Sequence, residues 1–172
     1  MDKYFYFVSQ LPALQFDRDP IITIDNFIIE AEKWLSKSDF AILSRVDPVE
    51  ITPEKDDPEV LKHYKKNQAV FLEELVLWRK SKTTEREYKS HLFPLHLLKE
   101  GTPLDAERLM LKWKWDEIEE QEYKHHFDLE FLIIYFMKLK ILHKLKSFDS
   151  ERGLKKYQSL CEAEIWIEHP EQ

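Results

Sequence analysis

Residues 127–142 read FDLEFLIIYFMKLKIL, and this stretch decides the fold. Its apolar run over residues 131–137 puts hydrophobic side chains on every side of a helix, which is typical of a helix surrounded by other helices. Asp128 suits an N-cap, so we predict a central helix from residue 129 to about residue 146. The run is far shorter than the ~20 residues that cross a bilayer, and no direct membrane insertion is expected.

The segment before this helix begins with the clearest boundary in the chain, Gly-Thr-Pro at residues 101–103. We predict a helix that starts near Leu104. One side of it carries Leu111, Trp115 and Ile118, and the other side carries Leu109, Met110 and Trp113. A helix that is apolar on two sides is expected to pack between two neighbours.

Three more helices are predicted upstream from apolar residues at helical spacing. The first begins at Thr23 or Asp25, either of which can act as its N-cap. The second covers residues 38–44. The third starts at Pro58, which suits the first position of a helix, and continues past Trp78.

The two ends of the chain are predicted to differ in secondary structure. The aromatic segment at residues 4–8 is expected to be a short strand or an extended piece laid on the core, and a last helix is expected over about residues 150–163. The predicted fold is all-α, an irregular bundle of about five to seven helices, with a short N-terminal extended segment as an option. One domain over residues 1–172 is expected, with sub-bundles 1–100 and 101–172 as the alternative.

Composition excludes several functions. The 172 residues include two glycines, Gly101 and Gly153, so no Gly-rich phosphate loop can be written. The single Cys161 excludes an intrachain disulfide and a multi-cysteine zinc site. A net charge of −7 argues against nucleic acid as a partner. Without a basic leader, the start predicts a cytoplasmic protein, with attachment to the inner membrane through a complex as an option.

Charge is unevenly spread along the chain, with five acids in residues 116–122 and an excess of lysine and arginine after residue 137. Two solvated helix faces would explain this pattern. Alternatively, the two regions form surfaces that dock between partners of opposite charge. The candidate partner-binding residues are Lys138, Lys140, Lys144, Lys146, Glu117, Glu120 and the C-terminal Trp166.

The sequence contains one weak candidate for a metal site and no candidate for a catalytic site. Glu122 and His125 have the Glu-x-x-His spacing that aims two metal ligands from one helix, but the motif occurs once, in a strongly acidic segment. A solvated helix end is the favoured explanation of this spacing. No catalytic residue and no cofactor are predicted. Four tryptophans lie at helical spacing among aliphatic residues and are expected in the core: Trp34, Trp78, Trp113 and Trp115.

Two segments resemble a known family. Residues 4–16 read YFYFVSQLPALQF and are similar to the opening of the bacterial family called domain of unknown function 2764, which starts with an aromatic run and a Ser-x-Leu-Pro-x-Leu element. Residues 127–142 look like the C-terminal helix of that family. The middle of the chain matches poorly, and the chain is shorter than many members.

The resemblance implies a function. Members are encoded among the genes of bacterial V/A-type ATPases, so the resemblance implies a non-enzymatic protein that replaces the C-type adaptor of the complex, between the central stalk and the membrane ring. The family brings no catalytic residues. Two alternatives stay open: a helical metalloprotein or enzyme with a metal near Glu122 and His125, and an unrelated helical interaction scaffold.

Overall fold

A computed structural model describes residues 4–83, 88, 101–148, 153–155 and 157–160. Its six substantial helices are α1 (Phe5–Gln10), α2 (Ile24–Trp34), α3 (Lys37–Arg45), α4 (Glu59–Thr83), α5 (Pro103–Glu122) and α6 (Leu129–Lys146). The described residues include no strand, so the predicted all-α bundle is confirmed. Residues 153–155 and 157–160 are also helical, within the predicted last helix; the rest of that helix lies outside the described residues.

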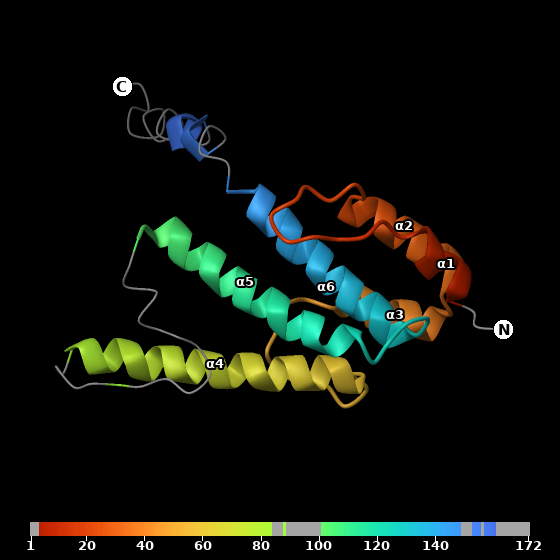
Figure 1. Ribbon diagram of the computed structural model, residues 1–172, viewed down its shortest axis with the longest axis horizontal. Helices are drawn as coiled ribbons and strands as arrows, with labels where there is room; N and C mark the ends of the chain where they lie inside the picture. Colours follow the sequence, from red (N-terminus) through yellow and green to blue (C-terminus); the bar gives the residue numbers. More distant parts are fainter. Residues whose placement is uncertain (1–3, 84–87, 89–100, 149–152, 156, 161–172) are drawn as a thin grey trace, which may run out of the picture.

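Helix α6 occupies the centre of the bundle, as predicted. In Figure 1, α5 lies between α4 and α6, and α1 and α2 lie on the opposite side of α6. All residues from Leu132 to Leu139 are buried. The helix begins where Asp128 Oδ1 accepts a hydrogen bond from the Phe131 N–H at 2.8 Å, which confirms the predicted N-cap.

Helix α5 is packed on both sides, also as predicted. Leu111, Trp115 and Ile118 are buried in the main core with α6. The opposite face packs a second cluster, in which Leu109, Met110 and Trp113 lie against Phe71, Leu75 and Trp78 of α4. The Thr102 side chain accepts from the Asp105 N–H while Asp105 accepts from the Thr102 N–H, and this capping box starts the helix.

Helices α2 and α3 cover another side of α6. Thr23, one of the two predicted candidates, caps α2 by accepting from the Asn26 N–H at 3.2 Å. Phe27 is fully buried and stacks on Phe136 of α6, with ring centroids 5.1 Å apart. The second predicted helix starts one residue early, at Lys37, because Ser36 supplies its N-cap.

The predicted extended segment at residues 4–8 is wrong, because α1 begins at Phe5. The Val8 N–H donates to the Tyr4 carbonyl oxygen at 2.9 Å, closing a helical turn. This turn places Phe7 inside the core, 5.5 Å from Phe27 between ring centroids. Burial of one ring thus outweighs the preference of aromatic residues for strands.

The loop between α3 and α4 is held by two buried groups of α4. Lys65 Nζ lies 2.9 Å from Asp57 Oδ2 and also donates to the Thr52 carbonyl oxygen. The Tyr64 hydroxyl donates to the Pro48 carbonyl oxygen at 3.0 Å. A charged, proline-containing loop therefore has a defined path over the bundle.

The four tryptophans that the structure describes differ in burial. Trp115 and Trp78 are buried, as predicted, and Trp113 is partly buried between α4 and α5. The prediction for Trp34 is wrong, because 39% of this residue is exposed. Trp34 is the last residue of α2, where the helix ends, and its ring stacks on Tyr6 at the surface.

The first prediction concerns the central helix. Ile134→Ala removes a fully buried side chain of α6 and should lower the free energy of unfolding by about 2–5 kcal/mol, measured by urea denaturation. The matched control is Ile29→Ala in α2, where 52% of the residue is exposed, and its cost should stay below about 1 kcal/mol. Equal losses in both variants would contradict the central placement of α6.

Candidate functional site

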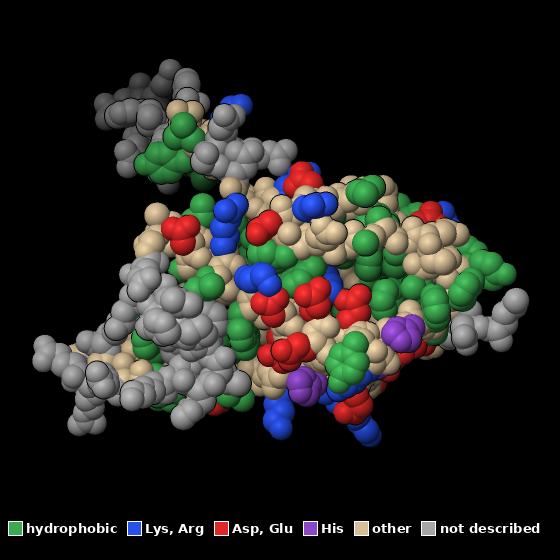
Figure 2. All heavy atoms as spheres, viewed as in Figure 1, with side chains coloured by type: hydrophobic (Ala, Val, Ile, Leu, Met, Phe, Trp, Pro, Cys, Tyr) green, Lys and Arg blue, Asp and Glu red, His purple; other side chains and the backbone are tan. Residues whose placement is uncertain are grey.

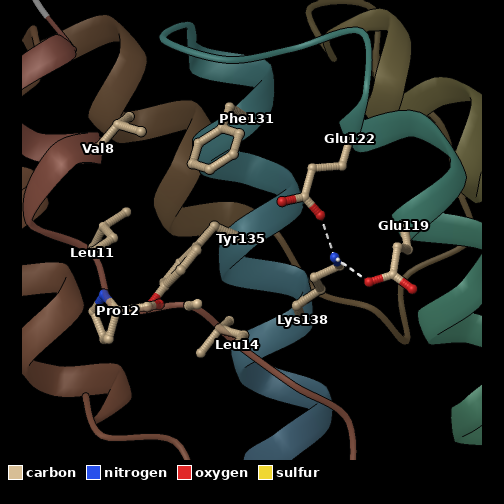
Figure 3. Close-up of a pocket in the computed structure, with 10 residues that line it drawn as sticks. Val8, Leu11, Pro12, Leu14, Glu119, Glu122, Phe131, Tyr135 and Lys138 are labelled. Carbon is tan, nitrogen blue, oxygen red and sulfur yellow. Dashed lines mark hydrogen bonds and ion pairs between the residues drawn. The ribbon is translucent and has the colours of Figure 1, made fainter.

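A pocket of about 310 Å³ opens between the segment that follows α1 and the helices α5 and α6 (Figure 3). One wall is apolar and comes from the N-terminal segment and from α6. The other wall is charged and is formed by Glu119 and Glu122 of α5 with Lys138 of α6. The lining residues are Val8, Leu11, Pro12, Ala13, Leu14, Glu119, Glu122, Phe131, Tyr135 and Lys138.

Lys138 is the central charged group of this pocket, with 4% of the residue exposed. Its Nζ lies 3.2 Å from Glu119 Oε1 and also donates to Glu122 Oε2 (Figure 3). The two acids are three residues apart on α5, a spacing that puts them on neighbouring positions of one helix face. Lys138 Nζ also lies 4.9 Å from the centre of the Trp115 ring, which adds a cation–π contact.

Tyr135 joins the apolar wall to the N-terminal segment. Its hydroxyl donates to the Pro12 carbonyl oxygen at 2.8 Å. Burial raises the pKa of the Tyr135 hydroxyl above its ordinary value, because the phenolate would lose its solvation. This hydrogen bond holds the segment over residues 11–14 in place as one side of the pocket.

The four predicted docking lysines do not form one basic surface. Lys138 is buried, and Lys140 donates to the Val46 carbonyl oxygen, with burial lowering the pKa of its ammonium group. Lys144 pairs with Glu107 at 3.3 Å, and Lys146 pairs with Asp19 at 3.0 Å. The last two have half-exposed side chains, so their role toward a partner stays a prediction. The prediction that these four lysines form one basic surface is therefore wrong, because Lys138 is buried and the four side chains contact different acceptors.

Two other predicted docking residues, Glu117 and Glu120, do not line the pocket around Lys138. Glu117 accepts a hydrogen bond from Asn67 Nδ2, which ties α5 to α4. Glu120 is exposed on α5. Trp166 lies outside the described residues.

The Glu122 and His125 pair is not brought together as a metal site. The Glu122 carboxylate turns to Lys138, whereas His125 Nδ1 lies 2.8 Å from Asp128 Oδ2. Glu130 adds a third potential ligand, and the three ligand atoms of His125, Asp128 and Glu130 lie within 4.8 Å of one another. However, Asp128 is occupied as the N-cap of α6, and the positive end of a helix dipole disfavours a cation there.

A second surface feature, missed in the sequence, is a group of exposed aromatic rings that we call the aromatic patch. It consists of Phe5, Tyr6, Trp34 and Phe127, with exposed fractions of 46, 49, 39 and 40%. The Phe5 ring lies 4.9 Å from Phe127 and 5.7 Å from Tyr6, and Tyr6 lies 6.2 Å from Trp34. In Figure 2, hydrophobic side chains gather at the end of the molecule where α1 lies.

Comparison with known proteins gives no relative. No family model matches the sequence, and neither the curated proteins nor the solved structures include a significant match. The family suggested by residues 4–16 and 127–142 therefore stays a prediction. Among the described helices, none is both long enough and apolar enough to span a bilayer.

The second prediction tests the buried charge. Lys138→Met leaves Glu119 and Glu122 side by side without their cation and should cost about 1–3 kcal/mol in the free energy of unfolding, measured with urea. Additional Glu119→Gln and Glu122→Gln changes should recover most of this loss. The control is Lys144→Met, which breaks an exposed pair and should cost at most about 1 kcal/mol. Equal losses for the two lysine variants would show that the Lys138 pair is no more important than a surface pair.

The third prediction concerns alkaline pH. The pKa of Tyr135 is higher in the folded than in the unfolded state. Once the pH exceeds the ordinary tyrosine pKa, the unfolded chain therefore binds fewer protons than the folded chain. Stability should therefore fall between about pH 9 and about pH 11, and the fall should be smaller in Tyr135→Phe. The change in the free energy of unfolding is measured by urea denaturation at about pH 9 and at about pH 11. The control is Tyr123→Phe, at a residue that is 71% exposed. The same pH dependence in Tyr135→Phe and wild type would refute this assignment.

Proposed function

We propose that the protein is a non-enzymatic adaptor that binds other proteins, and that its partners belong to a bacterial V/A-type ATPase. The observation that carries the binding role is the aromatic patch. The resemblance of residues 4–16 and 127–142 supplies the identity of the partners, a central-stalk protein on one side and a membrane-ring protein on the other.

The aromatic patch has the chemistry of a protein interface. Tyrosine and tryptophan are enriched among the residues that contribute most to binding, because they bury a large area at a small cost in side-chain entropy. Four rings in a row, from Phe127 through Phe5 and Tyr6 to Trp34, offer one continuous surface. Isolated exposed apolar residues would need no such explanation.

The aromatic patch is also supported by the core. It is assembled from α1, the end of α2 and the loop between α5 and α6, three places far apart in the sequence. Phe7 of α1 and Phe27 of α2 anchor both helices in the core beneath it. A partner that binds here therefore engages a preformed surface, and little binding free energy is lost to ordering.

The fourth prediction tests both parts of the proposal. Purified central-stalk and membrane-ring proteins are titrated with the protein in separate arms, and binding is measured by calorimetry. At least one of them should bind, and Phe5→Ala and Trp34→Ala should each weaken binding by about 2 kcal/mol, roughly 30-fold.

Controls are available on the same chain. Ile21→Ala and Val49→Ala change residues that are 86 and 72% exposed but do not belong to the aromatic patch, and they should bind like wild type. If no ATPase component binds, the partner assignment fails. If a component binds equally well to the Phe5 and Trp34 variants, the aromatic patch is not the interface.

A further inference from the structure

We propose that the pocket around Lys138 binds a guanidinium or ammonium group carried on an apolar stem. The group would meet the carboxylate of Glu122, with Glu119 adding negative charge, and the stem would lie against the wall formed by Leu11, Leu14 and Tyr135 (Figure 3). Neither the adaptor role nor the aromatic patch assigns any ligand to this pocket.

The charge of the pocket favours a cation. Its lining residues include two carboxylates and one ammonium group, so the described site carries a net charge of about −1 at neutral pH. Glu119 keeps 55% of its side chain exposed and Glu122 keeps 35%. Figure 2 shows acidic side chains gathered on the viewed face, with lysine and arginine side chains beside them.

Glu122 has a free oxygen on the side of Phe131 and Tyr135, whereas the free oxygen of Glu119 lies on the far side of Lys138 (Figure 3). Lys138 contacts Oε1 of Glu119 and Oε2 of Glu122, and the described residues provide no hydrogen bond to Glu119 Oε2 or Glu122 Oε1. A guanidinium group presents several N–H donors, which suit the free oxygen of Glu122, while Glu119 adds negative charge beside it. An anion would instead face two carboxylates, because the charge of Lys138 is already neutralised.

The opposite wall suits an aliphatic stem. Leu11, Leu14 and Phe131 are partly buried hydrophobic residues that pack against the main core beside the pocket. Basic side chains commonly bury their methylene groups on apolar surface while the charged end meets polar partners. A volume of about 310 Å³ lies at the lower end of small-ligand pockets, so one side-chain-sized ligand fits better than a nucleotide.

The basic group can come from two sources, an arginine or lysine of a bound protein or a free amine. Only the first source rests on the proposed adaptor function. The probe is therefore a small compound, n-butylguanidinium, added to the full chain without any partner. Binding is followed by the amide signals of Ala13 and Leu14 in two-dimensional NMR spectra.

Saturable shifts are expected with n-butylguanidinium. Guanidinium, which lacks the stem, and n-butanol, which lacks the charge, should each bind at least tenfold more weakly. Glu119→Gln should weaken n-butylguanidinium binding about tenfold, whereas Glu120→Gln, at an exposed acid of the same helix outside the lining, should not. Shifts of equal size with n-butanol, no saturation, or an unchanged affinity in Glu119→Gln would overturn the proposal.

A second variant avoids the buried ion pair. Ala13 lines the pocket and is exposed, so Ala13→Trp should fill the mouth and abolish the shifts elsewhere in the pocket while the spectrum stays that of a folded protein. Ala41→Trp, at an exposed alanine of α3, is the matched control and should bind normally. Unaltered binding by Ala13→Trp would overturn the placement in this pocket.

The source is decided in a competition experiment. If n-butylguanidinium displaces the ATPase component that binds the protein, the partner supplies the basic side chain. If the component stays bound while the compound saturates the pocket, the ligand is a free amine. If no ATPase component binds at all, the proposed function fails, but the titration of the isolated chain still decides the pocket.

Discussion

The structure depends on one constraint, the burial of α6 on all sides. All residues of this helix from Leu132 to Leu139 are buried. Water must therefore be excluded around its whole circumference, which one neighbouring helix cannot do. Helices α2 and α3 pack on α6, α5 packs along it, and α1 is held through α2. The irregular arrangement follows from covering one apolar cylinder with helices of unequal length.

Lys138 complicates this arrangement, because it places a charge within the covered stretch. A buried ammonium group needs opposite charge and hydrogen-bond acceptors nearby. Helix α5 supplies both through Glu119 and Glu122, and the Trp115 ring adds a polarisable surface. The acidic end of α5 is thus partly a structural requirement, and the same acids make one wall of the pocket.

The sequence predicted the helices better than the surfaces. Apolar periodicity located α6 and the two-sided packing of α5, and the caps at Thr23, Thr102 and Asp128 have side chains that suit their role. Sequence reasoning failed where tertiary contacts decide. The charge of Lys138 predicts a surface position, although the apolar residues before and after it in the chain were already a sign of burial. The aromatic patch joins three distant segments, so no local pattern could reveal it.

The hydrogen bond from Tyr135 to Pro12 joins residues that are 123 positions apart. A ribosome adds about 5–20 residues per second, so the N-terminal segment waits on the order of ten seconds for the tyrosine that secures it. During that interval α1, α2 and α3 have been made, but the helix they are meant to cover has not. Their apolar faces, Phe27 among them, are then open to water and to chaperones. We therefore expect that the apolar faces of α1, α2 and α3 need protection from aggregation until α6 has been synthesised.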